Sequence, residues 1–308
     1  MAAALAAGLV LSSRDDSQAA PSQTARAAVT ESSAATAERE PEAVLEQSAS
    51  RSGLTYDEQA RDRKVAISAE SYIAIEADTG RVLIARRDRQ KRPIASLTKM
   101  MTALLVIEAG ALDQPVEVPY VATQVVPSKE GLVVGQKVSR RLLLFSMMLV
   151  SANDSATALA YDGGDGSIAR FFRRMNARAR ALGMTDTRYR SASGLNDDAN
   201  WSSARDQVVL ARTALQDPLF AKIVRTKRKA VDWPAPAGEE VWVNHNELLS
   251  KFAGTYGVKT GFTGKAGNCL VAAVRRNGRS VIAVVLGSKS IYYDMPRLVN
   301  RAFALLES

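Results

Sequence analysis

The sequence is poor in cysteine and histidine, the residue types that most often bridge a fold or bind a metal ion. Its 308 residues include one cysteine, Cys269, so no intrachain disulfide can form and the fold must be held by apolar burial. The single histidine, His245, excludes a metal site built on two histidines. A Ser-His-Asp triad would have to use His245, for which we expect a structural role instead. We expect neither a metal ion nor a cofactor.

Negative charge is also scarce relative to positive charge. The chain has 41 Lys and Arg against 32 Asp and Glu, a formal net charge of +9. Such a charge favours anionic surroundings, namely nucleic acid, membrane lipid or cell-wall polymer. The basic residues are scattered and no nucleic-acid-binding motif accompanies them, so we expect no nucleic-acid partner. With 46% hydrophobic and 24% charged residues, the composition is that of a globular protein of one large or two small domains.

Large apolar residues are almost absent from the N-terminal part of the chain after its first residues. Residues 1–20 hold a short apolar run, Ala2–Leu11, and the small residues Gln18-Ala19-Ala20, which together resemble a secretory signal. The run is too short to span a bilayer and has no basic residues before it, so we hypothesise that the true start lies upstream or that the numbering begins inside the signal. A disordered tail is the alternative. We expect residues 21–64 to be a disordered linker and residues 65–308 to form the folded domain of an exported protein, in the periplasm or at the cell surface.

Strand patterns lie at both ends of the expected domain. Ser71–Glu76 and Arg81–Arg86 flank a turn with glycine and predict a β-hairpin. Ile94–Ala109, punctuated by Pro93 and Gly110, is apolar on nearly every side and predicts a central buried helix. Further helices are predicted at 140–150, 154–161, 168–182, 203–215 and 292–306, and further strands at 257–263, 268–276 and 280–287. This order predicts an α+β fold, in which both chain ends form one antiparallel five-stranded sheet flanked by helices, with an inserted, mostly helical lobe.

One predicted helix, 168–182, is rich in arginine. Its basic residues are Arg170, Arg173, Arg174, Arg178 and Arg180. A solvated basic face is the simpler interpretation, and docking onto an anionic cell-wall polymer is the alternative.

Ser96 and Lys99 form a Ser-x-x-Lys motif at the start of the predicted buried helix. Positions three apart share a helix face, so the two side chains should be in contact range. A serine hydroxyl is a poor nucleophile until a base removes its proton, and a lysine can be that base if burial or a nearby cation lowers its pKa. Alone, the motif arises by chance on the order of once in a chain of this length.

Two further motifs carry groups that suit peptide chemistry. Ser151 and Asn153, between two predicted helices, offer a hydroxyl that can relay a proton and an amide that can bind a carbonyl or position a lysine. Lys259, Thr260 and Gly261 lie on a predicted strand, whose edge can pair with a peptide backbone. Lys259 and Thr260 can hold a carboxylate, and Gly261 allows close approach of a substrate.

The order and spacing of the three motifs resemble those of penicillin-binding proteins and serine β-lactamases. The resemblance is strongest to the D-alanyl-D-alanine carboxypeptidases among the low-molecular-mass penicillin-binding proteins, over residues 65–308. It rests on the stretches 93–99, 151–156, 193–195, 203–206, 257–263 and 267–272. Asn244-His245-Asn246 is similar to a segment that these enzymes carry before the last motif, which favours the structural role of His245.

The resemblance implies a serine acyl-transfer mechanism on peptidoglycan stem peptides. Ser96 would attack the carbonyl between two D-alanines and form an acyl-enzyme that water hydrolyses, with Lys99 as the base. Ser151 would pass a proton to the leaving amine, and Asn153 would bind substrate or orient Lys99. β-Lactam antibiotics would be covalent inhibitors.

The resemblance also implies how the substrate is held. Lys259 and Thr260 would bind the terminal carboxylate beside Gly261, and the backbone N–H groups of Ser96 and Phe262 would form the oxyanion hole. Lys259 would in addition help to keep the nearby lysine base neutral. Phe262 is a large residue for this position, although only its backbone is needed.

Three alternatives to a carboxypeptidase are considered. A D,D-endopeptidase that cuts wall cross-links could use the same residues. A class A β-lactamase is disfavoured because no Glu-x-x-Leu-Asn loop occurs between Asn153 and Lys259. A non-catalytic wall-binding or penicillin-sensing domain would not need the complete set of reactive groups.

Overall fold

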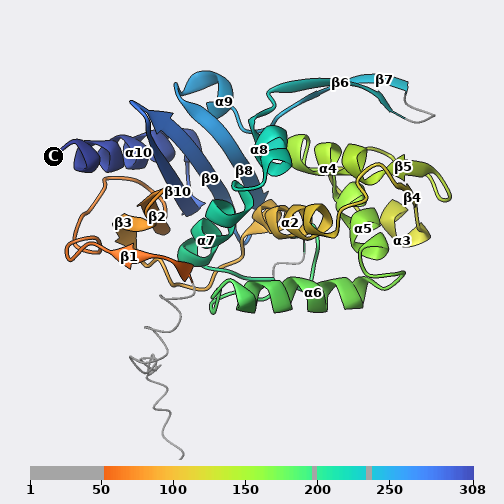
Figure 1. Ribbon diagram of the computed structural model, residues 1–308, viewed down its shortest axis with the longest axis horizontal. Helices are drawn as coiled ribbons and strands as arrows, with labels where there is room; N and C mark the ends of the chain where they lie inside the picture. Colours follow the sequence, from red (N-terminus) through yellow and green to blue (C-terminus); the bar gives the residue numbers. More distant parts are fainter. Residues whose placement is uncertain (1–51, 196–199, 234–237) are drawn as a thin grey trace, which may run out of the picture. The chain divides into compact units, whose positions relative to one another are not determined.

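The computed structural model describes residues 52–195, 200–233 and 238–308 (Figure 1). The signal-like segment 1–20 and the expected linker as far as residue 51 lie outside these described residues. The described residues belong to one compact unit. Its strands are β1 (Thr55–Tyr56), β2 (Ser71–Glu76), β3 (Arg81–Arg86), β4 (Pro115–Glu117), β5 (Lys137–Ser139), β6 (Arg228–Trp233), β7 (Gly238–Val243), β8 (Thr255–Thr263), β9 (Gly267–Arg276) and β10 (Arg279–Ser288). Its helices are the 3-10 helix η1 (Ala95–Thr98) and α2 (Lys99–Ala109), α3 (Tyr120–Thr123), α4 (Arg140–Leu149), α5 (Asn153–Asp162), α6 (Ile168–Ala181), α7 (Ala204–Ala214), α8 (Pro218–Arg225), α9 (Leu248–Lys251) and α10 (Ile291–Glu307).

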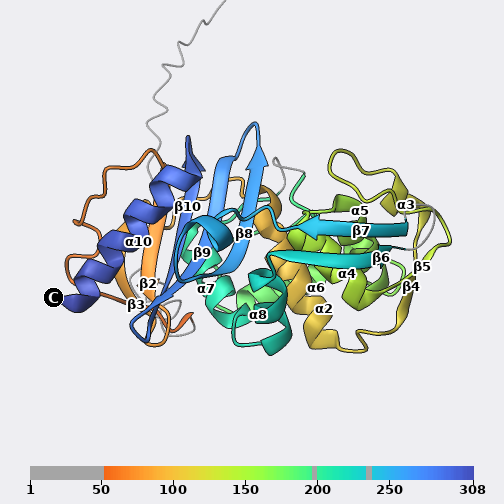
Figure 2. The ribbon, with the colours of Figure 1, turned by 90° about the horizontal axis from the view of Figure 1, so that it is seen from above.

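Both ends of the described chain build the main sheet, as predicted. The strand order is β1-β3-β2-β10-β9-β8, and the five strands from β3 to β8 are antiparallel to their neighbours. The sixth strand, β1, pairs in parallel with β3 through Thr55 and Arg81, so the prediction of five strands was one short. The α+β class and the inserted helical lobe are confirmed (Figures 1 and 2).

The sheet is covered by helices on both faces, which explains the continuous apolar runs of its central strands. All six residues of β2 are buried. On one face, Tyr72 and Leu83 pack with α10; on the other, Ile73 and Val82 join the larger core that contains α2 and α7. Figure 2 shows α10 lying along the sheet, with α7 and α8 beyond β9 and β8. The last strand, β8, is an edge strand and contacts η1.

The helical lobe is inserted between β3 and β8 and surrounds α2. Helices α4, α5 and α6 contact α2, which is buried along most of its length as its apolar sequence predicts. Serine side chains cap three of the predicted helices: Ser139 accepts from the backbone N–H of Leu142, Ser167 from that of Arg170, and Ser203 from that of Asp206. The β6–β7 hairpin, which the sequence analysis did not predict, extends from the sheet side along α4 (Figure 1).

The fold begins earlier in the sequence than residue 65. Residues 52–64, assigned to the linker from their polar composition, contribute β1 and three buried residues, Ser52, Leu54 and Ala60. The hydroxyl of Tyr56 donates a hydrogen bond to Asp88. Two apolar anchors and one strand pairing are therefore enough to attach a segment whose overall composition resembles a linker.

Candidate active site

Ser96 and Lys99 lie at the junction between the sheet and the helical lobe. The predicted helix 94–109 starts with a 3-10 turn, η1, that carries Ser96, and becomes α-helical at Lys99. Lys99 Nζ lies 2.9 Å from Ser96 Oγ. The Lys99 side chain is fully buried, whereas Ser96 is partly exposed. The serine can therefore reach a substrate while its neighbouring amine is shielded from water.

The Lys99 amine has two further partners, which decide how it can act. Its Nζ donates to Asn153 Oδ1 at 2.7 Å and to the backbone carbonyl of Ser193 at 2.8 Å. A neutral amine has two N–H groups and one lone pair. With both N–H groups occupied by these carbonyl oxygens, the lone pair points toward Ser96 Oγ. The cluster thus positions Lys99 to accept the hydroxyl proton of Ser96.

The electrostatic surroundings favour the neutral form of that amine. Burial, and next the positive charge of Lys259, hold the pKa of Lys99 well below its usual value of 10.5, while Asp154 acts in the opposite direction. The desolvation of a charged ammonium is the dominant cause because this side chain has no contact with solvent.

Ser151 and Asn153 are placed by the start of α5. Ser151 has a left-handed backbone (φ 63°), which is unusual for a residue other than glycine. In this conformation its hydroxyl accepts a hydrogen bond from Lys259. Asn153 is 3% exposed. Its backbone N–H donates to Ser128 O at 2.8 Å and its side-chain amide donates to Pro127 O. These bonds orient the Asn153 carbonyl toward the lysine amine.

Lys259 approaches the cluster from the edge strand β8. It is 2% exposed, and its Nζ donates to Ser151 Oγ and to the backbone carbonyl of Thr260, each at 3.1 Å. Burial lowers the pKa of Lys259 to about 7. Neither oxygen is charged, so the ammonium has no neutralising carboxylate among these partners and can bind an anion.

The absence of a side chain at Gly261 has a structural role besides the expected one. A Cβ atom at this position would lie 2.9 Å from Ser96 N and 3.1 Å from Ile94 O, so the missing side chain lets β8 pack against η1. The next residue, Phe262, is 66% exposed and points away from the core. Within the described chain the Ser96 N–H has no hydrogen-bond partner, which leaves it available to a ligand.

The Ser193 carbonyl is a functional group that the sequence analysis missed. The stretch 193–195 was noted for its resemblance, without a role. In the structure its neighbour Gly194 has φ +87°, and a Cβ there would lie 1.9 Å from Ala95 O. Only glycine fits, and the tight packing holds the preceding carbonyl against Lys99. A Ser-Gly pair is the only sequence signal of this contact.

Cys269 is fully buried in β9, and His245 makes hydrogen bonds through its backbone. The backbone of His245 bonds to Leu149 O and to the Tyr292 hydroxyl, at 3.1 and 2.9 Å. Burial and the charges of Lys259 and Lys99 lower the pKa of His245. The described residues hold no group of three or more His, Cys, Asp or Glu side chains that could bind a metal ion. None of the helices in the described ranges is both long and apolar enough to cross a membrane.

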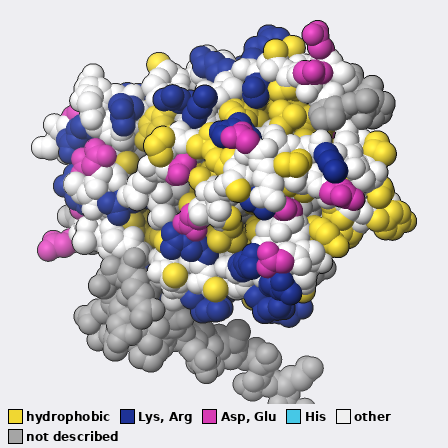
Figure 3. All heavy atoms as spheres, turned by 45° about the vertical axis from the view of Figure 1, so that its right-hand side comes forward, with side chains coloured by type: hydrophobic (Ala, Val, Ile, Leu, Met, Phe, Trp, Pro, Cys, Tyr) yellow, Lys and Arg dark blue, Asp and Glu magenta, His cyan; other side chains and the backbone are white. Residues whose placement is uncertain are grey.

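The arginine-rich helix α6 is partly neutralised by neighbouring acids. Three of its five arginines form ion pairs: Arg170 and Arg174 with Asp165, and Arg178 with Glu108. The other two, Arg173 and Arg180, are exposed. On the face shown in Figure 3, basic side chains occur singly or in small groups with acidic ones among them.

Comparisons with known proteins agree with this geometry. Residues 57–290 match the family model of D-alanyl-D-alanine carboxypeptidase. A D-alanyl-D-alanine carboxypeptidase from a Streptomyces strain is 35% identical over 79% of this chain and 89% of its own. A protein of the same name from Mycobacterium tuberculosis is 36% identical over 71% of this chain and 75% of its own. A D-alanyl-D-alanine endopeptidase from Pseudomonas aeruginosa is 35% identical over 75% and 76%.

A solved structure shares the fold at similar identity. The crystal structure of a Streptomyces DD-transpeptidase superimposes with a TM-score of 0.74 at 35% identity, covering 79% of this chain and 99% of the other. The match of both sequence and structure extends over the sheet and the helical lobe that supply the clustered serines and lysines. This chain is therefore a serine-type hydrolase that belongs to the D-alanyl-D-alanine carboxypeptidase family.

Proposed function

We propose that this enzyme removes the terminal D-alanine from peptidoglycan stem peptides through an acyl-enzyme on Ser96. The observation that carries the proposal is the position of Lys99 Nζ, 2.9 Å from Ser96 Oγ, with both N–H groups of its neutral form occupied by Asn153 and Ser193. A buried neutral amine with its lone pair toward a hydroxyl is an arrangement that activates a serine nucleophile.

The first step is acylation. Lys99 takes the proton from Ser96 Oγ, which attacks the carbonyl carbon between the last two D-alanines. The negative charge that develops on the carbonyl oxygen is stabilised by the backbone N–H groups of Ser96 and Phe262. The free Ser96 N–H and the contact of β8 with η1 at Gly261 support this oxyanion hole.

The second step is departure of the terminal D-alanine. The C–N bond breaks and its nitrogen takes a proton from Ser151 Oγ. Lys259 Nζ, 3.1 Å from that hydroxyl, replaces the proton and in doing so connects the carboxylate site to the leaving group. Once the D-alanine has left, water enters the site and carries the proton held by Lys99 to Lys259, so that Lys99 is neutral again. Lys99 then accepts a proton from the water molecule that attacks the ester and passes it to Ser96 Oγ as the C–O bond breaks, which restores the starting state.

The substrate carboxylate is held by Lys259 and Thr260. Lys259 is a buried ammonium with only neutral oxygen partners, and Thr260 follows it on the edge strand. A C-terminal carboxylate satisfies that charge, which favours a substrate that ends at the second D-alanine. Cleavage of a cross-link by an endopeptidase is the second candidate, because relatives with both names are of similar identity to this chain.

Penicillin labelling tests the nucleophile. The full chain, Ser96→Ala and the control Ser250→Ala, an exposed serine of α9, would each be incubated with benzylpenicillin and examined by intact mass spectrometry. We expect a stable adduct on the first and third proteins only. An adduct on Ser96→Ala, or none on the wild type, would overturn the assignment.

Product analysis separates the two candidate reactions. The wild type would be incubated with a pentapeptide that ends in D-Ala-D-Ala and, separately, with a cross-linked dimer of stem peptides. We expect release of free D-alanine from the pentapeptide at a higher kcat/KM than cleavage of the dimer. The reverse order would favour the endopeptidase.

We further propose that the protein is exported and meets anionic wall polymer. The signal-like residues 1–20 and the class of substrate support export, which N-terminal sequencing of the secreted protein would test.

The exposed Arg173 and Arg180 of α6 support polymer contact. The variant with both Arg173→Gln and Arg180→Gln should co-sediment less with purified cell walls than the wild type. Equal binding of the two proteins would contradict polymer contact.

A further inference from the structure

The β6–β7 hairpin contacts the loop at residues 124–136, which joins α3 to β5. Trp242 of β7 is 3% exposed and packs edge-to-face on Trp233, with ring centroids 5.2 Å apart. Its Nε1 donates to Glu130 Oε2 at 2.8 Å and to Glu240 Oε2 at 3.2 Å. An indole has one donor and no acceptor, so two carboxyl groups from different segments share one N–H.

The loop that carries Glu130 is fastened to the start of α5. Asp154, which is fully buried, accepts the backbone N–H groups of Glu130 and Leu132 at 2.9 and 3.2 Å. In the same loop, the carbonyls of Pro127 and Ser128 accept both N–H donors of Asn153 described above. The loop therefore lies between the hairpin and the residue that orients Lys99.

The Glu130 side chain is surrounded by negative charge. The charged groups that act on it are Glu240 of β7 and Asp154 of α5, both acidic. Burial and these two neighbours raise the pKa of Glu130 to about 7, although the bond from Trp242 acts in the opposite direction. Glu130 therefore loses its proton near neutral pH, and its anionic form is repelled by the neighbouring Glu240.

We propose that the Trp242–Glu130 contact is a latch that fixes the 124–136 loop, and that Glu130 is thereby a positioning residue for the Asn153–Lys99 pair. The proposal rests on the function proposed above, since it concerns the same lysine base. Loss of the latch lowers the rate of acylation because the loop carbonyls no longer hold the Asn153 amide at one orientation.

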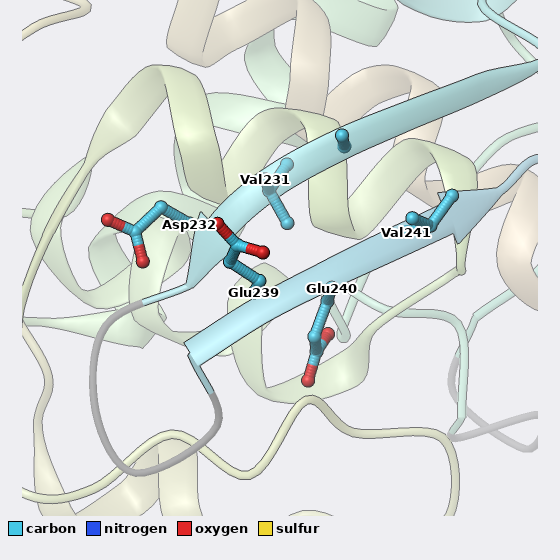
Figure 4. A pocket seen from close by; sticks show the side chains of 6 residues that line it. Val231, Asp232, Glu239, Glu240 and Val241 are labelled. Atoms are coloured by element: carbon cyan, nitrogen blue, oxygen red, sulfur yellow. The ribbon is translucent and has the colours of Figure 1, made fainter.

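The other acidic residues of the hairpin supply a control. Glu239 and Asp232 are paired across the two strands and are exposed, whereas Glu240 extends to the opposite side of its strand from Glu239 (Figure 4). Glu239 has no part in the latch. Its change to glutamine removes a negative charge of the same hairpin without touching the Trp242 contact.

Rates of acylation and turnover test the latch. The wild type, Trp242→Phe, Glu130→Gln and the control Glu239→Gln would be compared by stopped-flow acylation with a chromogenic β-lactam and by peptide kinetics from pH 5.5 to 9. We expect Trp242→Phe to lower the acylation rate constant about tenfold, the size expected for loss of a hydrogen bond to a charged acceptor. The KM should change less than about twofold, because substrate binding is not affected. The control should follow the wild type at every pH.

The pH dependence of Glu130→Gln distinguishes the latch from a purely structural role of this residue. Glutamine keeps an oxygen for Trp242 Nε1 but cannot ionise. The ratio of the Glu130→Gln rate to the wild-type rate should therefore rise severalfold between pH 6 and pH 8, and titration of the two lysines cancels in this ratio. A flat ratio together with wild-type acylation by Trp242→Phe would overturn the latch.

A spectroscopic titration separates failure of the latch from failure of the proposed function. The chain has three tryptophans, and the indole N–H resonance that is missing from Trp242→Phe belongs to Trp242. This resonance should shift with a midpoint near pH 7 in the wild type and not in Glu130→Gln. An enzyme that is never acylated but shows this shift would contradict the serine mechanism alone. An active enzyme without the shift would contradict the latch alone.

Discussion

Lys259 lies close enough to Lys99 for its positive charge to lower the pKa of the Lys99 amine, and each lysine bonds to a different serine. Lys99 reaches Ser96, and Lys259 reaches Ser151. In the mechanism proposed above, each amine therefore has a distinct proton to transfer: Lys99 takes one from Ser96, and Lys259 supplies one to the leaving group through Ser151. The repulsion between two ammonium groups favours the state in which only one of them is charged.

This pairing predicts a bell-shaped dependence of kcat/KM on pH. Activity rises as Lys99 loses its proton, and because its pKa is lowered, the rising limb should lie well below pH 10.5. Activity falls as Lys259, with a pKa of about 7, loses the charge that binds the substrate carboxylate. Initial rates at low peptide concentration would measure both limbs. A single limb that rises only above pH 9 would contradict the assignment of Lys99 as the base.

Lys259→Arg should remove the falling limb. A guanidinium stays charged throughout the measurable range, so carboxylate binding should no longer weaken above pH 7. The maximum of kcat/KM should be lower, since the planar group cannot reproduce the bond to Ser151. Peptide kinetics up to pH 10 would check this, with Lys251→Arg, an exposed lysine of α9, as the control. Persistence of the same falling limb would show that another group causes it.

Asn153→Asp should move the rising limb to higher pH. The substitution keeps the shape of the side chain but places an anion where Asn153 Oδ1 now lies, 2.7 Å from Lys99 Nζ. An adjacent anion stabilises the ammonium form and raises the lysine pKa. Acylation by a β-lactam at pH 6 should slow about tenfold or more and recover at higher pH. Asn300→Asp, at an exposed position of α10, should behave as the wild type; an unmoved limb in the active-site variant would contradict the model.

Gly261→Ala should damage both stability and acylation. The added Cβ meets backbone atoms of η1, which cannot rotate away as a side chain would. We expect a loss of about 1–3 kcal/mol in the free energy of unfolding, the range for overpacked sites. The shift of β8 away from Ser96 should also slow acylation. Urea unfolding and β-lactam kinetics would be compared with Gly264→Ala, where the added methyl group meets no atom within 4 Å. Equal behaviour of the two variants would refute the close packing.

The elements that the sequence predicted well are those with strong local patterns. The hairpin strands β2 and β3 were predicted at their observed bounds, because two short apolar runs flank a turn with glycine there. The hairpin β6–β7 was missed because exposed charged residues such as Arg228, Asp232 and Glu239 interrupt its apolar pattern. The helix α8 was missed although Asp217 and Pro218 are a standard N-terminal signal, since it is only eight residues long.

In the candidate site, too, groups with a local sequence signal were predicted and groups without one were not. The five predicted residues lie in two neighbouring hydrogen-bonded groups, which are Lys99 with Ser96 and Asn153, and Lys259 with Ser151. The groups are close enough for the charge of Lys259 to lower the pKa of Lys99. The carbonyls that orient these groups could not be predicted, because any residue type can supply a backbone oxygen. Their positions depend on tertiary packing, such as the glycine that presses the Ser193 segment against Ala95.

The side chains of the candidate site come from three parts of the chain that meet at the junction between the sheet and the helical lobe, the two halves of the fold. Ser96 and Lys99 lie at this junction on η1 and α2. Asn153 is the first residue of α5, Ser151 lies in the turn before it, and Lys259 comes from the edge strand β8. A small slip of one half against the other would lengthen several of these contacts at once. The catalytic rate should therefore depend on how the two halves are packed together. Under heat or denaturant it should decline before either half loses its helices or strands.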